Sequence, residues 1–224
     1  MTRTPEAPPL RRDAERNRRR ILEAARTLLA EHGLDVSHDD IARAADVGVG
    51  TVYRRFPTKE DLLAALFADR VERTGALADE ALTADDAWQG LRWYLERVVE
   101  QQAADRGWRQ LVLGPTAPHL SRLARGRIAP SATALVERAH AAGQLRQDVS
   151  AQDVALVPLM VGAVVDRCEV VVPGLWRRAL TLVLDGMRAD GAGARPPLPV
   201  RPLSGDELEQ VMSQGPGPRP PGRG

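Results

Sequence analysis

Residues 37–67 read SHDDIARAADVGVGTVYRRFPTKEDLLAALF and contain the clearest structural pattern in the chain. A first short helix has a small, flat apolar face formed by Ile41 and two alanines. The tripeptide at 46–48 (Asp-Val-Gly) predicts a turn. A second short helix follows from about Val49 to Phe56 and ends before a proline. Two short helices separated by a tight turn and backed by a longer helix are typical of a helix-turn-helix.

Hydroxyl-bearing residues mark where two of these helices begin. Ser37-x-x-Asp40 and Thr58-x-x-Asp61 resemble capping boxes, with aspartate in place of the usual glutamate or glutamine. The first predicts the start of the short helix, and the second predicts the start of the longer helix that follows. The small face of the first short helix lets the second cross it closely.

A further helix is expected upstream, from about Ala14 to Glu31. Its apolar residues recur at helical spacing and are Ile21, Leu22, Ala25, Leu28 and Leu29. Gly33 can adopt the left-handed conformation that lets the chain turn after this helix. The residues of the next two helices that we expect in the same core are Ile41, Val47, Val52 and Phe56.

Composition and pattern divide the chain into four regions. Residues 1–13 are expected to form a flexible leader, since the first ten hold three prolines and little apolar content. Residues 14–60 are assigned to a helix-turn-helix DNA-binding domain, and residues 61–189 to a larger helical domain. Residues 190–224 are rich in proline and glycine and are expected to be disordered. Apolar residues recur at helical spacing without alternating, so the predicted fold class is all-α.

Within the larger domain, glycine and proline residues separate six candidate helices. These lie at about 85–103, 105–113, 119–127, 131–142, 151–167 and 174–189. The last two are the most apolar, so most of their surface must be buried.

The overall charge and the apolar runs exclude several classes of protein. A net charge of +1 does not by itself indicate a nucleic-acid partner. The longest apolar run, Val154–Val165, is shorter than the roughly 20 residues that cross a membrane, and the N-terminus lacks the apolar stretch of a secretory signal. The single cysteine, Cys168, excludes an internal disulfide and fits a reducing compartment. We therefore expect a cytoplasmic protein without a membrane partner.

The segment that begins at Ser37 follows a long, ordered pattern, (S/T)-x-x-x-I-A-x-x-A-x-V-x-x-G-T-x-Y-x-x-F-x-x-K-x-x-L. This pattern resembles the signature of the TetR family of transcriptional regulators, and with the upstream helix the likeness covers about residues 14–67. Two positions depart from it. Asp46 stands where the family usually has glycine, and Gly48 replaces a common serine or threonine. Because aspartate tolerates a left-handed backbone better than most residues, we expect the turn to form at some cost in stability.

The resemblance implies a homodimer that binds a palindromic, double-stranded DNA operator, with the helix at about 49–56 in the major groove. It also implies that the last two helices of each subunit form a four-helix dimer interface. The larger domain would bind a small-molecule effector. The preferred function is a transcriptional repressor that the effector releases from DNA, with an activator or a regulator without a ligand left open.

The chemistry of the predicted recognition helix agrees with contact to DNA. Thr51 and Tyr53 offer hydroxyls for phosphate oxygens, and Lys59 is a compact cation beside the N-terminus of the next helix. Arg54 and Arg55 are long enough to reach phosphates or a guanine edge.

Four further residues and an arginine-rich segment complete the predicted DNA site. Val49 can contact a thymine methyl group, and Gly50 permits close approach of the backbone. Ser37 and His38 are candidates for phosphate contacts at the start of their helix. The arginine-rich segment can follow the minor groove or neighbouring phosphates, or can be a solvated helix start, and it contains Arg16, Arg18, Arg19 and Arg20.

The effector site is the least defined part of the prediction. Apolar pockets with a few polar groups are the usual binding architecture, and the candidate lining residues are Trp88, Trp93, Tyr94, Trp108 and Met160. Large aromatic side chains at helical spacing also pack in cores, so both roles stay open. No cofactor or metal is expected, and the class of ligand is not readable.

The sequence disfavours two other functions, an all-helical enzyme and a thiol-based redox regulator. An all-helical enzyme is disfavoured because the four histidines are scattered and neither a zinc-binding HExxH nor a GxSxG nucleophile motif occurs. A thiol-based redox regulator would use Cys168. That residue follows the apolar run directly, which favours a buried, unreactive thiol.

Overall fold

The computed structural model describes residues 9–105, 123–189 and 196–213. Within these ranges the regular secondary structure is helical, apart from an isolated antiparallel bridge between Leu145 and Arg188. The predicted all-α class is therefore confirmed. None of the described helices is both long and apolar enough to span a membrane.

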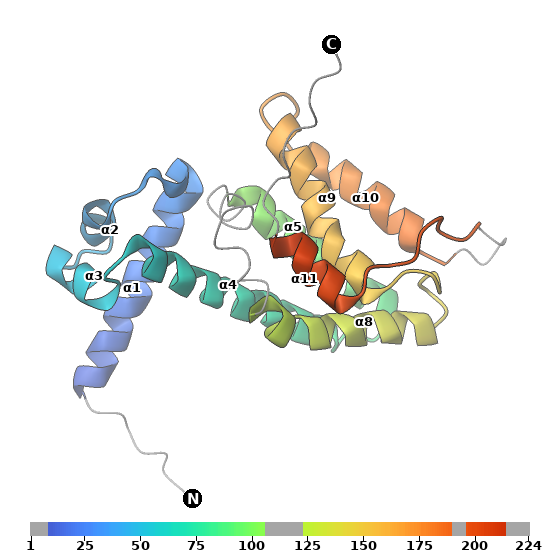
Figure 1. Cartoon of the computed structure of the whole chain (residues 1–224), viewed down its shortest axis with the longest axis horizontal. Coiled ribbons are helices and arrows are strands. Elements are labelled where there is room, and N and C mark those ends of the chain that lie inside the picture. The colour runs from blue at the N-terminus through green and yellow to red at the C-terminus, as the bar shows by residue number, and fades with distance from the viewer. Residues whose placement is uncertain (1–8, 106–122, 190–195, 214–224) are drawn as a thin grey trace, which may run out of the picture.

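The N-terminal part of the chain forms a small head, which we define as α1 to α3 with the first turns of α4 (Figure 1). The bounds are Pro9–His32 for α1, Gly33–Asp35 for the 3-10 helix η1, His38–Ala44 for α2 and Val49–Arg55 for α3. The long helix α4, Lys59–Ala81, starts in the head and continues into the helical domain, so it joins the two parts.

In the described part of the helical domain, further helices follow α4. They are α5 (Ala87–Ala104), α8 (Ala129–Ala141), α9 (Ala151–Cys168), α10 (Leu175–Met187) and α11 (Gly205–Ser213). Figure 1 shows α9 and α10 side by side, with α10 on the edge of the domain away from the head.

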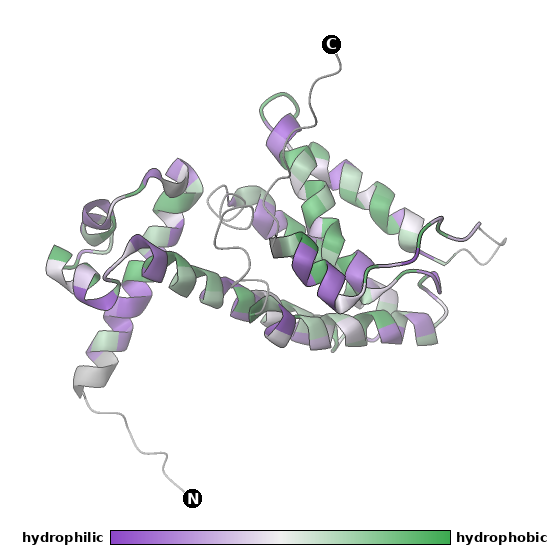
Figure 2. Cartoon of the chain, viewed as in Figure 1, coloured by the Kyte–Doolittle hydropathy of each residue, from purple (hydrophilic) through white to green (hydrophobic). Residues whose placement is uncertain are grey.

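The head and the helical domain have separate hydrophobic cores. In the head, Ile21, Ile41, Val52 and Phe56 are buried as predicted, and Val47 is half-buried against them. The larger core is formed by α5, α8, α9 and α10, and Figure 2 shows apolar residues along nearly the whole of α9. Between the two cores, two buried α4 residues form a small cluster of their own, Phe67 and Val71.

Both predicted capping boxes are present. The Ser37 hydroxyl accepts a hydrogen bond from the backbone of Asp40, and the Asp40 carboxylate accepts one from the backbone of Ser37. Thr58 and Asp61 make the same pair of bonds at the start of α4. These bonds satisfy backbone donors that a helix start otherwise leaves unpaired, and so they fix where α2 and α4 begin.

Two predicted boundaries are wrong. The first helix starts at Pro9 and not at Ala14, so part of the expected leader is helical. Proline suits a first helical position because its fixed φ matches the helix and no amide donor is lost. The expected disorder of 190–224 does not hold for α11, whose apolar residues pack against the helical domain.

The predicted helices at 85–103, 131–142, 151–167 and 174–189 correspond to α5, α8, α9 and α10. The expected helix at 105–113 and the first part of that at 119–127 lie outside the described residues, whereas residues 123–127 are helical.

Candidate DNA-binding surface and effector cavity

The recognition helix α3 has one buried face and one open face. Val52 is completely buried and Phe56, its C-cap, is 4% exposed, which fixes the helix against the head core. On the opposite face Val49 and Tyr53 are 41% and 49% exposed. An added Cβ at Gly50 would meet no atom within 4 Å, so close approach of a partner is possible there. Exposed apolar and aromatic side chains on so short a helix indicate a contact surface.

His38 sets the position of the Tyr53 ring. The two rings stack with centroids 4.7 Å apart and planes 12° apart. His38 is itself 9% exposed, and its Nε2 is hydrogen-bonded to the backbone oxygen of Phe56 at 3.0 Å. Because the His38 ring is buried and paired, its geometry does not favour the predicted phosphate contact by this side chain. The His38 ring orders Tyr53 by stacking on it, and positions 38 and 53 are too far apart in the sequence for a local pattern to indicate this contact.

Replacing His38 with valine tests this positioning role. Valine keeps the site apolar but removes the stacked ring, which contributes about 0.5–1.5 kcal/mol in an aromatic pair. We expect DNA affinity to fall about threefold to tenfold, measured by fluorescence anisotropy. In a Tyr53→Ala background the same substitution should have little further effect, since the ring that it positions is gone. A full additional loss in that background would contradict the role.

Ser37 acts as the cap of α2. Its hydroxyl accepts from the Asp40 amide at 3.2 Å and lies 2.5 Å from the Asp40 carboxylate, to which it donates. Hydrogen bonds from Ser37 lower the pKa of Asp40. The hydroxyl uses its single proton to donate to Asp40 and also accepts a hydrogen bond within the cap. The predicted donation to a phosphate by this side chain would therefore require the cap to break.

The turn between α2 and α3 has the expected left-handed residue. Asp46 has a φ of 50°, and Arg20 of α1 pairs with its carboxylate at 2.9 Å and donates to its backbone oxygen at 3.2 Å. The α3 N-cap, Gly48, makes no side-chain cap bond, as expected from the missing hydroxyl.

Two substitutions at the turn separate backbone strain from the ion pair. Asp46→Gly and Asp46→Ala both remove the pair with Arg20, but only alanine must place a Cβ in the left-handed region. We expect Asp46→Ala to be less stable than Asp46→Gly by about 1 kcal/mol, measured by chemical denaturation. Equal stabilities would mean that the turn relaxes out of this conformation.

The arginine-rich segment is helical and locally paired. Arg16 lies 3.3 Å from Asp13, Arg18 lies 3.8 Å from Glu15, and Arg20 is committed to the turn. An α-helix is about 10 Å wide and the minor groove about 6 Å, so this segment cannot enter the minor groove as a helix. A contact with neighbouring phosphates stays compatible with its exposure.

The remaining predicted DNA residues surround the end of α3 and the start of α4. Arg54 and Arg55 are exposed in the last turn of α3, and Arg54 donates weakly to the half-buried Thr51 at 3.4 Å. Arg55 approaches Glu15 of α1 at 4.0 Å. Lys59 is the first residue of α4, where the helix dipole also favours an anion. The structure thus places Arg54, Arg55 and Lys59 close in sequence to the exposed Tyr53, where α3 ends and α4 begins.

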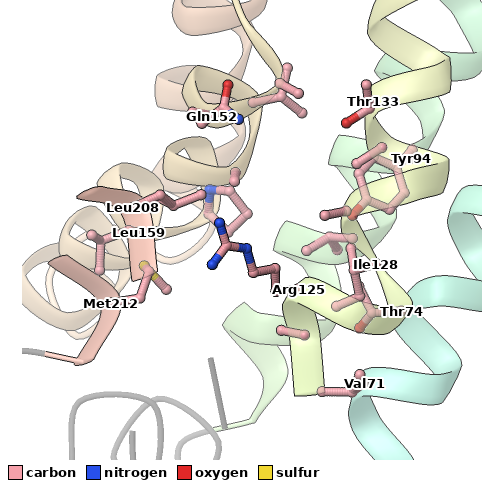
Figure 3. Close-up of a pocket in the computed structure, with 18 of the residues that line it drawn as sticks. Val71, Thr74, Tyr94, Arg125, Ile128, Thr133, Gln152, Leu159, Leu208 and Met212 are labelled. Atoms are coloured by element: carbon pink, nitrogen blue, oxygen red, sulfur yellow. The ribbon is translucent and has the colours of Figure 1, made fainter. Parts of the chain in front are cut away.

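A cavity of about 420 Å³ lies in the helical domain, between α4, α5, α8, α9 and α11. This volume is within the range of small-molecule sites. Most of its wall is apolar, and Figure 3 shows the polar residues Thr74, Tyr94, Thr133 and Gln152 among the lining side chains. Arg70 also lines it while only 6% exposed, and burial lowers the pKa of its guanidinium to about 10, against the attraction of Asp105.

The predicted effector residues are not brought together. Only Tyr94 of the four that are described lines the cavity. Trp88 is 3% exposed within the core, Trp93 packs at its edge, and Met160 is 50% exposed on α9. Trp108 lies outside the described residues. The cavity is instead formed mainly by small and aliphatic side chains from α4, α5, α8, α9, α11 and the helical residues 123–127, and the sequence offers no local signal for this combination.

Cys168 is the last residue of α9 and is half-buried. The chain contains no second cysteine with which it could pair. Among the described residues, Cys168 belongs neither to the cavity wall nor to the core of the head, so the structure does not favour the redox alternative.

A helix-turn-helix head on a helical domain that contains a ligand-sized cavity defines a class, the DNA-binding transcriptional regulators. Comparison with known proteins identifies the family. Residues 21–66 match the family described as "Bacterial regulatory proteins, tetR family", and residues 86–189 match "Transcriptional regulator SbtR-like, C-terminal domain". The chain belongs to the TetR family.

Individual relatives agree with this assignment. A TetR regulatory protein from Mycobacterium vanbaalenii is 34% identical over 80% of this chain and 99% of its own, with a TM-score of 0.58. The regulator SCO0520 from Streptomyces coelicolor is 31% identical over 78% and 99%, with a TM-score of 0.62. The transcriptional repressor LfrR from Mycolicibacterium smegmatis is 42% identical over 89 residues, which cover 39% of this chain and 44% of LfrR. The chain spans less than half the length of such curated relatives.

Proposed function

We propose that this protein is a repressor that binds a palindromic operator as a homodimer and leaves it when a small molecule occupies the cavity. The observation that carries the DNA role is the open face of α3, where a half-exposed Tyr53 is held by a buried histidine. Stacking on His38 orders the Tyr53 ring while leaving it exposed to a partner. The arginines beside it supply charge for the backbone of a duplex.

Dimerisation is supported by the outer faces of α9 and α10. Met160 of α9 is 50% exposed and Leu182 of α10 is 63% exposed, although both belong to the most apolar helices of the chain. A symmetric partner would bury the same two residues on both subunits. Two heads related by this axis could then bind two half-sites of one operator.

The path from cavity to head runs along α4. Its residues Phe67, Arg70 and Thr74 line the cavity, while Lys59 at its start borders α3. Within this cavity-lining part of α4, the Asp69 carboxylate lies 2.7 Å from Arg26 of α1. A ligand that displaces α4 would therefore tilt the head and change the distance between the two half-site contacts. The protein would then have two states with different affinities for DNA, and the ligand would favour the state that binds DNA weakly.

The test uses the purified full chain and the DNA upstream of its own gene. We expect protection of a palindromic segment in a footprint, together with an affinity that falls steeply with salt. A scrambled duplex of the same length is the control. Tyr53→Phe should weaken binding to both half-sites if its hydroxyl contacts phosphate. Equal affinity for the upstream and scrambled DNA at low ionic strength would overturn the proposal.

A further inference from the structure

Part of the cavity wall comes from a helix outside both family matches. The C-terminal family match ends at residue 189, whereas α11 covers Gly205–Ser213. Four of its residues line the cavity, namely Gly205, Leu208, Glu209 and Met212. Figure 3 shows Leu208 and Met212 beside Leu159 of α9, with Tyr94 and Thr133 on the opposite wall. The helix is amphipathic, and its outward Val211 is 40% exposed.

Besides its apolar packing, α11 makes two ion pairs with a single arginine. Arg125 lies 2.6 Å from Asp206 and 2.6 Å from Glu209, through two different nitrogens of its guanidinium. A Cβ at Gly205 would come within 2.8 Å of this group, so glycine makes room for the pair. The Arg125 side chain is 45% exposed and Asp206 is 90% exposed. Ion pairs this exposed stabilise weakly and are screened by salt.

Residues 196–198, which precede α11, are held more firmly than α11 itself. Arg146 donates to the backbone oxygen of Pro196 at 3.0 Å, and the Asp148 carboxylate accepts from the backbone of Leu198 at 2.8 Å. Arg146 and Asp148 also pair with each other at 2.8 Å, with side chains only 15% and 34% exposed. The hydrogen bonds from Arg146 and Leu198 hold the pKa of Asp148 far below its usual value. The chain can therefore release α11 while residues 196–198 stay in place.

The cavity wall offers the uncharged polar groups of Tyr94, Thr133 and Gln152. Arg70 also lines the cavity and is charged, but the nearby carboxylate of Asp105 opposes its charge. Tyr94 is 5% exposed, and within the described part of the chain its hydroxyl has no hydrogen-bond partner. The side chains of Thr133 and Gln152 are likewise unpaired among the described residues. Burial raises the pKa of Tyr94, so its hydroxyl stays protonated and can donate. The charges of Arg125 and Glu209 at the cavity wall neutralise each other.

From this arrangement we propose that α11 is a lid over the effector site, and that the site takes an uncharged, mainly apolar molecule whose hydroxyl or carbonyl group bonds to Tyr94. The inference rests on the proposed function only in calling the ligand an effector. Ligand entry requires α11 to leave the α8–α9 side of the cavity, and closure returns Leu208 and Met212 to the bound molecule. Binding itself needs no DNA.

The ligand class is tested with three probes of one shape, 2-naphthol, naphthalene and naphthalene-2-sulfonate, by calorimetry on the full chain without DNA. We expect 2-naphthol to bind most tightly and the sulfonate least. Tyr94→Phe should weaken 2-naphthol about tenfold, as expected for one lost buried hydrogen bond, and leave naphthalene unchanged. Tightest binding of the sulfonate, or an unchanged affinity of Tyr94→Phe for 2-naphthol, would overturn the proposed class.

The lid is tested by the rate at which 2-naphthol leaves, followed by stopped-flow fluorescence. Arg125→Gln should release it about threefold to tenfold faster, and raising salt from about 0.05 to about 0.5 M should speed release from the wild type. The matched control is Arg92→Gln, which breaks an exposed pair with Glu96 at 2.8 Å on the other side of α5. Equal rates of 2-naphthol release from the wild type, Arg125→Gln and Arg92→Gln would overturn the lid. Tight binding of 2-naphthol without release of operator DNA would instead contradict the proposed function alone.

Discussion

Lys59→Ala should weaken operator binding about 30-fold at physiological salt. Lys59 begins α4 directly beyond the recognition helix, and a homodimer presents it twice. Loss of about 1 kcal/mol in each half-site gives about 2 kcal/mol in total, which corresponds to this factor. The slope of log affinity against log salt should also become shallower by about two, one unit for each lost phosphate contact. Anisotropy titrations over a salt series measure both quantities.

Two comparisons make this result specific. Arg92→Ala removes an exposed cation of α5 and should leave the salt slope unchanged. Lys59 is also the only lysine in the chain, so an amine-reactive acetylating reagent marks one side chain besides the N-terminus. Bound operator should protect Lys59 from that reagent. Full reactivity in the complex, with an unchanged slope for Lys59→Ala, would remove this residue from the interface.

In the proposed dimer, Leu182→Glu should separate the two subunits into monomers and abolish operator binding with it. The symmetric interface would receive two unpaired carboxylates, each costing several kcal/mol once buried. A total of at least about 4 kcal/mol raises the dimer dissociation constant about 1000-fold. In the single chain Leu182 is 63% exposed, so the fold itself should be unaffected. Light scattering gives the mass, and circular dichroism checks the helices.

Val170→Glu serves as the control for an added charge at an exposed apolar position. Val170 is 96% exposed in the connection between α9 and α10, and its substitution should leave the mass of the assembly unchanged. A dimer that survives Leu182→Glu would place the interface elsewhere on the molecule.

The head was predictable because its determinants are local. The capping boxes, the turn at Asp46 and the apolar spacing of α1 each involve residues within one or two turns of each other. Local patterns of this kind bias the chain before any tertiary contact forms. The open face of α3 followed directly, since burial of Val52 and Phe56 leaves only one side for Tyr53.

The rest of the site depends on contacts between distant residues. The cavity is lined by residues that lie between positions 67 and 212 on several helices, so no single window of sequence contains it. The aromatic residues predicted to line the effector site are large apolar side chains that also stabilise a core, and Trp88 is buried in the core of the helical domain. Helix α11 is only 9 residues long, which is too short to be stable alone, and it forms on the surface that Arg125 and α9 provide.

The separation of the two hydrophobic cores has an evolutionary and practical consequence. Among the described residues, α4, the small cluster at Phe67 and Val71 and side-chain pairs such as Arg26–Asp69 connect them, and the buried residues of each core are distinct. Mutations in α3 that change which DNA sequence is recognised can therefore accumulate without repacking the helical domain. Mutations that change the cavity can likewise accumulate without repacking the head. A chimera that joins this chain's residues up to Leu66 to a relative's remaining helices should fold, and would answer that relative's inducer at this protein's promoter.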